Sequence, residues 1–420
     1  MSHSILRRLA IVPTLTAAVA FTGAAYGTES ASASSNNVTL TVWTYYTGAQ
    51  QQAALKAQDA LFEASNPNVT VQQVFVPGSE LDSKLLAEAA VKSGPDVVLT
   101  NVVVDFFELS DAGALYNLTS DWNSYPDRSQ FPAASVWTNG KGRIYDLMSY
   151  SNLLGLYYNK TILDQYHLTP PKTIAQLVAD MKVVKAGGKY TPLAAADSPT
   201  VDGAWTWFPL LLQNGETYCN LTVPKVTQAY QTVYDWAQAG YLPKEADTWT
   251  QSTSWTEFMT GKFAFGINGN WNLGDAKAAT FSWGTTQYPA GPDGYHVFPG
   301  GEGLAIGAFT KHEALAWDYL KEAWLSQQGS ILDFKYSGQI PIRADVANTP
   351  LVKKDTTVAP FVAATRTVSA WPRNPNTSDM QEYVGTELSD VVSGQVTVKS
   401  AAAATVSHIL GEIKAGGGSC

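Results

Sequence analysis

Residues 38–76 read VTLTVWTYYTGAQQQAALKAQDALFEASNPNVTVQQVFV, with a strand pattern on either side of a helical pattern. Residues 38–45 and 69–76 are rich in β-branched side chains that alternate with other residues, as expected of β-strands. The segment between them carries two apolar pairs about two turns apart on one helix face, and Asn66-Pro67 ends this helix. Since parallel strands joined through a helix cross over in the right-handed sense, the stretch predicts a parallel β-α-β unit.

The alternation of strand and helix patterns continues along the chain. Residues 96–99 form another apolar strand pattern. Thr173 and Gln176 have the spacing of a capping box, and the apolar-periodic run that follows them stops at a glycine pair, which predicts a helix over residues 174–185. This alternation indicates α/β layers.

A second capping-box spacing, Thr310 with Glu313, precedes a long apolar-periodic segment. The spacing predicts a helix that continues to Gly329, with Trp317 and Trp324 on its apolar face. We expect both tryptophans to lie in a hydrophobic core.

Composition and charge narrow the class of protein. The chain has 420 residues, 45% apolar and 15% charged, which is enough for two domains with separate cores. A net charge of -9 argues against binding to nucleic acids or anionic membranes, which need basic patches. Arg7 and Arg8 precede an apolar run over residues 9–25, the order of a secretory signal, with cleavage after Gly27 or Ala33. The sequence predicts an exported protein without a later segment that spans a bilayer.

The chain contains two cysteines, Cys219 and Cys420, which excludes a disulfide-dense scaffold. The sequence leaves open whether they pair. Residues 416–420, GGGSC, are typical of a flexible tail and are compatible with an exposed thiol on an appended segment.

Motifs for metal binding and catalysis are missing from the sequence. The histidines beyond the signal region do not pair with one another at helical spacing or cluster with cysteine, so no metal site is predicted; they are His167, His296, His312 and His408. We find no GxSxG elbow, P-loop or GxGxxG after a strand, and we expect no cofactor. A pair such as Asp202 and Glu302 would suit a glycosidase only at a working separation that sequence does not give.

Residues 261–273, GKFAFGINGNWNL, change abruptly from core to polar residues. The alternating apolar side chains before residue 268 predict a strand. Asn268-Gly269 predicts a turn that breaks the strand, which leaves Asn270 and Trp271 on an exposed rim. The alternative is a Trp271 ring that folds back into the core.

Aromatic residues next to polar ones recur at expected turns. A sugar ring packs its apolar face on an aromatic ring while its hydroxyls need amide, carboxylate or guanidinium partners, so this pairing favours a carbohydrate ligand. Core packing is the alternative for each ring taken singly. The segments are WTYY at 43–46, YSN at 150–152, WTW at 205–207, NW at 270–271 and WPRN at 371–374.

The order of segments resembles the family 1 extracellular solute-binding proteins of ABC transporters, the group that includes maltose-binding protein. The resemblance covers most of the chain beyond the signal region. It rests on VWTYYTG at 42–48, SGPDVVLTN at 93–101, GRIYDLMSYSNLLGLYYNK at 142–160, GKFAFGINGNW at 261–271, GGEGLAIGAFTKHEALAWDYLKEAW at 300–324 and SGQIPIRADV at 337–346.

The resemblance implies a two-lobed α/β fold of the periplasmic-binding-protein type (type II), with the ligand in the cleft between the lobes. Chain crossings are expected near residues 148–156 and 300–305. The implied divisions are a signal peptide and leader over 1–33, lobe 1 over 37–150 plus 304–350, lobe 2 over 151–303 plus 351–414, and a tail over 415–420. The implied function is capture of a mono- or oligosaccharide by lobe closure and delivery to an ABC transporter permease, by a monomer without catalytic activity.

The resemblance also implies a set of ligand-binding residues that we carry over by position. On the first lobe they are Tyr45, Tyr46, Thr47, Thr100 and Asn101; at the first crossing, Ser151 and Asn152; on the second lobe, Trp205, Trp207, Asn270, Trp271, Arg373 and Asp379; at the return crossing, Gly301 and Glu302.

The sequence departs from the family pattern at two kinds of position. Thr47 and Asn152 stand where maltose-binding protein has carboxylates, so the identity of the ligand is not carried over. No cysteine for lipid attachment follows the signal, which leaves retention at the cell envelope open. The alternatives are a secreted glycoside hydrolase, or the same fold binding ferric ion through Tyr45, Tyr46, Tyr157 and Tyr158, or another small solute.

Overall fold

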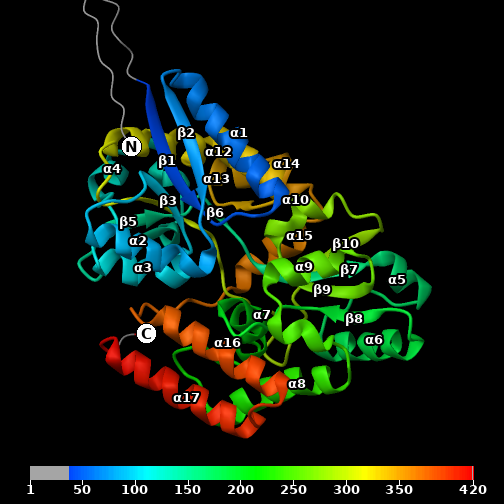
Figure 1. The fold of residues 1–420 in the computed structure, drawn as a ribbon. Helices are drawn as coiled ribbons and strands as arrows, with labels where there is room; N and C mark the ends of the chain where they lie inside the picture. The colour runs from blue at the N-terminus through cyan, green and yellow to red at the C-terminus, as the bar shows by residue number, and fades with distance from the viewer. Residues whose placement is uncertain (1–36, 419) are drawn as a thin grey trace, which may run out of the picture. The chain divides into compact units, whose positions relative to one another are not determined.

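The computed structural model describes residues 37–418 and 420 (Figure 1). The expected signal sequence and both expected cleavage points lie outside these residues. Within the described part, every helix is too short or too polar to cross a lipid bilayer.

A six-stranded sheet forms the centre of the first lobe. Strand β1 lies parallel to β2 on one side and to β3 on the other, and α1 connects β1 to β2, which confirms the predicted β-α-β unit. The strand order is β2 (Val69–Phe75), β1 (Val38–Thr44), β3 (Val97–Thr100), β11 (Gly303–Ile306), β5 (Ile144–Leu147) and β4 (Val136–Thr138).

Helices cover the faces of this sheet and bury its apolar side chains. The predicted core positions of the late helical segment are confirmed, because Trp317 and Trp324 are both buried with the strand residues Leu40 and Leu99. The helices are α1 (Ala49–Ser65), α2 (Leu81–Ala90), α3 (Val102–Asp111), α4 (Thr119–Ser124), α11 (Glu313–Tyr319) and α12 (Gln327–Ser337).

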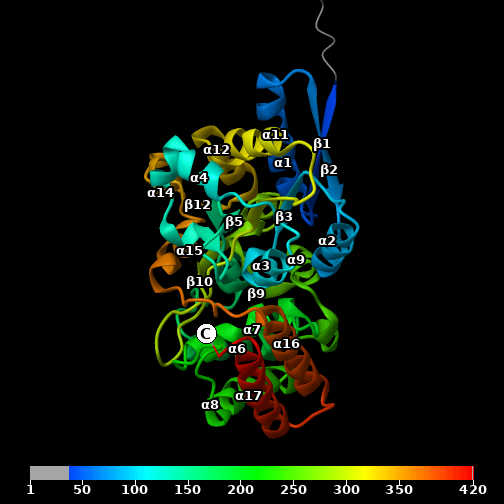
Figure 2. The same cartoon turned by 90° about the vertical axis from the view of Figure 1, so that its left-hand side faces the viewer.

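A four-stranded sheet forms the centre of the second lobe, with a separate hydrophobic core. Its order is β10 (Trp283–Gln287), β7 (Leu154–Asn159), β9 (Phe263–Gly269) and β8 (Thr191–Ala194). Figure 2 shows α16 and α17 side by side. The helices grouped with this sheet are α5 (Lys160–Gln165), α6 (Ile174–Gly187), α7 (Val201–Leu212), α8 (Val223–Gln238), α9 (Gln251–Met259), α15 (Ala359–Ala364), α16 (Thr377–Ser393) and α17 (Val398–Ala415).

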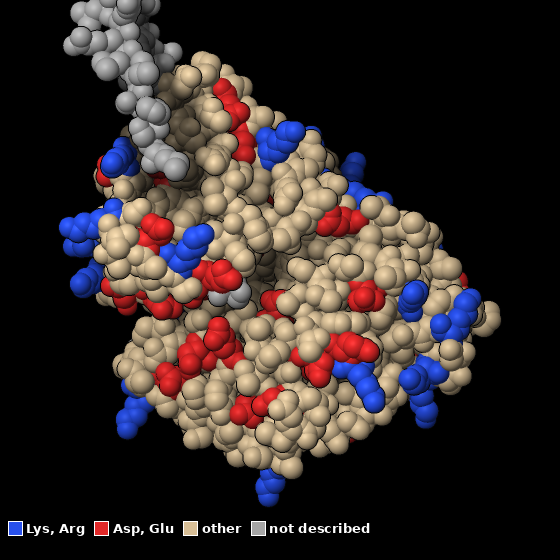
Figure 3. Space-filling model, viewed as in Figure 1, with Lys and Arg blue, Asp and Glu red and all other residues tan. Residues whose placement is uncertain are grey.

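The chain passes between the two sheets near Asn152 and again near Gly300, and these two residues pair through backbone hydrogen bonds of 2.9 and 2.8 Å. The short strands β6 (Tyr150–Ser151) and β12 (Ile340–Pro341) pair close by. Figure 3 shows a hollow between the part that carries α2 and α3 and the part that carries α7 and α9, with acidic side chains at its edges. The predicted α/β fold with two lobes is confirmed. The remaining short helices are α10 (Leu273–Ala276), α13 (Ala344–Ala347) and α14 (Pro350–Lys353).

The ends of two helices test the predicted capping-box interpretation. For α6 it is confirmed, since Thr173 Oγ1 accepts a hydrogen bond from Gln176 N and Gly188 ends the helix in a left-handed conformation, φ 66°. For the later helix it is wrong. Thr310 Oγ1 donates to Asp96 Oδ1 (2.5 Å) and helix α11 begins only at Glu313.

Gly329 is not the stop of the late helical segment. A π-helical turn over residues 320–325 follows α11, and Ser326 then caps a new helix, α12, by accepting a hydrogen bond from Gly329 N (2.9 Å). The apolar face continues through this break, which is why its periodicity suggested one helix.

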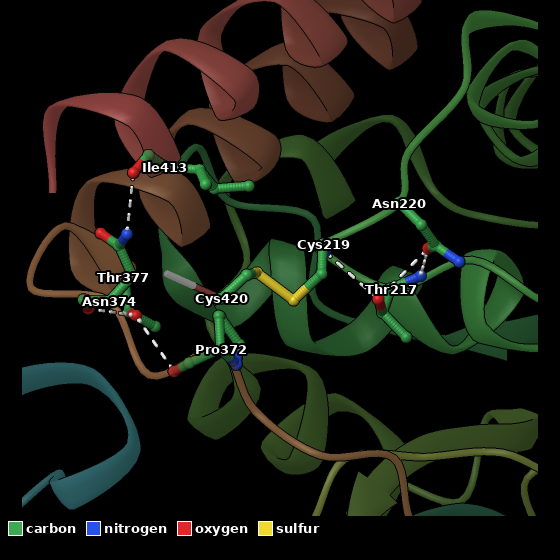
Figure 4. The surroundings of a disulfide bond; sticks show 8 residues. All are labelled: Thr217, Cys219, Asn220, Pro372, Asn374, Thr377, Ile413 and Cys420. Atoms are coloured by element: carbon green, nitrogen blue, oxygen red, sulfur yellow. Dashed lines mark hydrogen bonds between the residues drawn. A yellow bond between two sulfur atoms is a disulfide. The ribbon is translucent and has the colours of Figure 1, made fainter. Parts of the chain in front are cut away.

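The two cysteines pair with each other. Cys219, between α7 and α8, and Cys420, after α17, form a disulfide (Figure 4). The sequence left the pairing open, and of the two possibilities the structure has the disulfide and not the free thiol at the tail. The bond ties the end of the chain to a loop 201 positions earlier.

Candidate functional site

A buried carboxylate lies where the two chain crossings meet. Glu302 Oε1 accepts a hydrogen bond from the Tyr45 hydroxyl (3.1 Å), and Oε2 accepts from the Tyr150 hydroxyl and from Asn152 Nδ2 (3.3 Å). The Tyr46 hydroxyl bonds in turn to that of Tyr150. Burial raises the pKa of Glu302 to about 7, although hydrogen bonds from tyrosine lower it. The cluster joins the end of β1 to both crossings.

Two glycines let the crossings approach each other. A Cβ on Gly300 would overlap Asn152 Oδ1 and would lie 2.6 Å from the indole of Trp205. Gly301 has φ 148°, a conformation that L side chains rarely adopt, and a Cβ there would lie 2.8 Å from the Tyr150 carbonyl oxygen. Because Gly300 and Gly301 have no side chains, Glu302 can lie next to the first crossing, with the Trp205 ring close to that crossing.

Trp205 lies between the two lobes. Its Nε1 donates to Gln381 Oε1 (3.0 Å) on α16, while Gln381 Nε2 donates to the Val103 carbonyl (3.2 Å) on α3 of the first lobe. The Trp205 ring lies 5.2 Å from that of Trp371, which stacks on Phe298 at 4.0 Å. Trp205 and Trp371 are half-buried, so each keeps part of its ring surface accessible.

The first lobe contributes carboxylates close to this region. Asp105, on α3, is almost fully buried and accepts a hydrogen bond from the backbone N–H of Asn101 (3.3 Å); burial and then the Asp82 carboxylate raise the pKa of Asp105 well above its ordinary value. Thr100 Oγ1 donates to Asp146 Oδ2 (2.6 Å), and burial raises the pKa of Asp146 to about 7. Both carboxyl groups are buried, and their raised pKa values favour the protonated, uncharged form.

Trp271 follows β9 at the second-lobe side. Its ring lies against Gly269, where a Cβ would overlap it, and is half-buried against the core. The predicted turn at Asn268-Gly269 is wrong, because β9 continues through Gly269 with an extended backbone (φ -98°). The glycine is needed for the approach of the ring and not for a positive φ.

The sequence profile of the bacterial extracellular solute-binding proteins matches residues 57–360, most of the chain. The chain belongs to this family. The resemblance found from the sequence is thereby confirmed.

Individual relatives support the assignment. The multiple sugar-binding protein of Streptococcus mutans is 27% identical over 299 residues, which cover 65% of this chain and 68% of the relative. The galactooligosaccharide-binding protein of Bacillus subtilis is 22% identical over 436 residues, 96% of each chain.

Solved structures share the fold. The GacH receptor of Streptomyces glaucescens superposes with a TM-score of 0.81 at 23% identity, covering 90% of this chain and 99% of that one. Maltose-bound MalE3 of T. maritima superposes with a TM-score of 0.80 at 20% identity, covering 89% and 99%.

Two expected contact residues of this solute-binding protein lie in its core. Asn270 is fully buried: Oδ1 accepts from Leu153 N (2.7 Å), and Nδ2 donates to the Gly338 carbonyl and to Gln339 Oε1 (3.1 Å each). Its expected place on an exposed rim is wrong, because these three partners come from distant parts of the chain. Trp207 is also buried.

The Trp207 indole donates to Asp197 Oδ1 (2.7 Å) within the second-lobe core. Trp205 and Trp207 therefore differ in environment although they lie two positions apart on α7.

The other predicted contact residues lie at the surface or at the crossings. Arg373 and Thr47 are exposed, and Asp379 is exposed beside His408. Ser151 donates to the Gly300 carbonyl (3.2 Å).

The sequence interpretation missed residues that complete the site. Asp105 was not singled out, and Tyr150 and Trp371 were noted only as aromatics in polar segments. Tyr150 directly precedes the predicted Ser151, and Asp105 interrupts an apolar helix, VVVDFF, where a buried charge needs a reason. Those local signals could have found both.

The four tyrosines of the ferric-ion alternative are divided between the two lobes. Tyr157 lies in the second-lobe core and donates to the Gly269 carbonyl (2.7 Å), whereas Tyr45 and Tyr46 pack in the first lobe, so the four tyrosines form no single group. Asp202 Oδ2 accepts from Gln251 N (2.9 Å), which links α7 to α9.

Proposed function

We propose that this protein is the extracytoplasmic carbohydrate-binding component of an ABC importer, which captures a sugar between its lobes and delivers it to a membrane permease. The observation that carries the proposal is the meeting of a half-buried tryptophan, Trp205, with the Glu302 hydrogen-bond cluster at the chain crossings. An aromatic face beside hydroxyl and carboxylate groups suits a sugar. The relatives named as sugar- and galactooligosaccharide-binding proteins support this ligand class.

We propose lobe boundaries at 37–150 plus 304–350 and at 151–303 plus 351–414. Under this division the crossings act as the hinge. A sugar favours closure because it contacts both lobes at once only in the closed state. The permease then recognises the closed form, and release of the sugar is the functional step.

Within the cleft we propose different roles for the candidate residues. Trp205 and Trp271 provide ring faces, since both remain half-buried. Tyr45, Asn101 and Glu302 provide hydrogen bonds from the first lobe and the return crossing. The supporting residues, which hold these in place, are Tyr46, Thr100, Ser151, Asn152, Trp207, Asn270 and Gly301.

A thermal-shift panel of mono- and oligosaccharides tests the ligand class. A ligand at about 100 times its dissociation constant stabilises the folded state by roughly 2.7 kcal/mol, so a cognate sugar should raise the melting temperature measurably. No shift with any sugar, together with a shift on adding ferric salts, would overturn the proposal in favour of iron binding.

A second assay addresses catalysis. Oligosaccharides incubated with the protein should be recovered unchanged when analysed by chromatography. Turnover at enzymatic rates that is lost in both Asp202→Asn and Glu302→Gln would replace the transport proposal by a glycosidase.

A further inference from the structure

Three side chains of types that can ligate a metal ion lie close together where α16 packs against α17. Their ligand atoms all lie within 4.8 Å of one another: a carboxylate oxygen of Asp379, an imidazole nitrogen of His408 and a carboxylate oxygen of Glu412. His408 Nε2 lies 2.5 Å from Asp379 Oδ2. His408 and Glu412 are four positions apart on α17, which puts them on one helix face, opposite Asp379 on α16.

Neighbouring residues hold two of the three side chains in orientation. The His408 imidazole stacks on the Tyr383 ring, with centroids 3.7 Å apart and planes 8° apart. Asn376 Nδ2 donates to Glu412 Oε2 (2.8 Å). Such outer contacts fix the direction of ligands at metal sites.

The cluster carries uncompensated negative charge. Among the ion pairs of the described residues, none joins a lysine or arginine to Asp379 or Glu412. The carboxylates of Asp379 and Glu412 therefore have no cationic partner among the described residues other than the His408 imidazole. A divalent cation would supply it.

We propose that Asp379, His408 and Glu412 bind a divalent transition-metal ion of the Zn²⁺ class, with water at the remaining position. One imidazole nitrogen and two carboxylate oxygens suit Zn²⁺, whereas Ca²⁺ and Mg²⁺ prefer oxygen ligands alone. Zinc bonds to nitrogen and oxygen of about 2.0–2.2 Å require only that His408 and Asp379 move apart slightly to admit the ion.

The proposed ion would fasten the last helix to its neighbour. The end of α17 is already tied to the loop before α8 through Cys219–Cys420, and α16 carries Gln381, which contacts both lobes. No metal site was predicted from the sequence, because these ligands come from two helices and only one of them is a histidine. This inference is independent of the sugar-binding proposal.

Isothermal titration of the metal-free protein, without a histidine tag, with ZnCl₂ tests the site. We expect one Zn²⁺ per chain. His408→Ala should weaken binding by at least about tenfold, the lower end of what loss of a supporting residue costs at metal sites. His296→Ala is the matched control, because His296 also faces one carboxylate, Asp293 at 3.8 Å, in a pair for which no third ligand is found among the described residues. It should bind Zn²⁺ like the wild type.

Two further readouts separate the site from a folding defect. Asp379→Asn and Glu412→Gln keep the side-chain shape and should also weaken Zn²⁺ binding, while all variants retain the wild-type circular dichroism spectrum. Zn²⁺ should raise the melting temperature of the wild type but not that of His408→Ala. Equal Zn²⁺ binding by wild type and His408→Ala, no binding up to millimolar Zn²⁺, or tighter binding of Ca²⁺ than of Zn²⁺ would overturn the proposal.

Discussion

The Tyr45 hydroxyl donates a hydrogen bond of 3.1 Å to Glu302 Oε1, although 257 positions separate the two residues in the chain. Tyr45 directly follows the first strand of one lobe, and Glu302 lies at the return from the other. The hydrogen bond between Tyr45 and Glu302 therefore joins the proposed hinge to the edge of the proposed cleft. Any change at Glu302 should affect both the hinge and the cleft.

Glu302 should make stability depend on pH. Burial raises its pKa from 4.5 to about 7, so its contribution to stability is present in full below pH 4.5 and is lost as the pH rises through 7. We expect the unliganded melting temperature to fall between pH 5 and 8, and to fall less in Glu302→Gln. A residual slope should remain from other buried carboxyls with raised pKa values, among them Asp59, Asp105, Asp146 and Asp333.

Differential scanning calorimetry at several pH values measures this slope. Glu245→Gln is the control, because Glu245 is exposed and its replacement should leave the slope unchanged. Parallel slopes in wild type and Glu302→Gln would contradict the assignment of this group to the pH dependence.

Trp271 and Trp207 should respond differently to truncation. Trp271 is half-buried, so Trp271→Ala should weaken sugar binding several-fold and lower the melting temperature of the unliganded protein only slightly. Trp207 is 1% exposed, and Trp207→Ala should cost about 3–5 kcal/mol of stability. Calorimetric titration and chemical denaturation measure the two effects. A comparable stability loss in both variants would identify the Trp271 ring as core.

The sequence was most informative where structure depends on near neighbours. The first β-α-β unit and the start of α6 were predicted because strand alternation and the Thr173 cap are local. Thr310 and Asn270 were misplaced because their partners come from elsewhere in the chain: Thr310 bonds Asp96, and Asn270 bonds Gly338. A polar side chain that serves a distant backbone group looks the same in sequence as one that faces a cleft.

The same limit applies to the proposed site. The aromatic and polar segments around it were predicted, but sequence did not distinguish Trp205, which faces the lobe boundary, from the buried Trp207. Their separation follows from the helical rotation of about 200° over two positions, combined with a packing arrangement that only the structure supplies.

Replacement of Gly301 by alanine should lower the stability of the protein. Gly301→Ala would force φ 148° on an L-residue and bring its Cβ against Met148 and the Tyr150 carbonyl. We expect a loss of about 1–3 kcal/mol in stability and weaker sugar binding, because Glu302 is displaced with its neighbour. Gly94→Ala is the matched control for conformation alone, since Gly94 has a similar φ of 142° and a Cβ there would lie no closer than 3.8 Å to another atom. Equal effects in the two variants would mean that the contact with the crossing is unimportant.

The disulfide should stabilise the second lobe strongly, because it closes a loop of 201 positions. In the chain-entropy description, crosslinks of long loops restrict the unfolded chain most, and removal of a native disulfide costs about 2–5 kcal/mol. The double variant Cys219→Ser with Cys420→Ser should therefore unfold at lower denaturant concentration than the wild type. Reductant should shift the wild-type transition toward that of the double variant and leave the double variant unchanged, which separates loss of the crosslink from any other effect of serine. Coincident transitions of oxidised wild type and double variant would show that the tie between the chain end and the loop before α8 adds no stability.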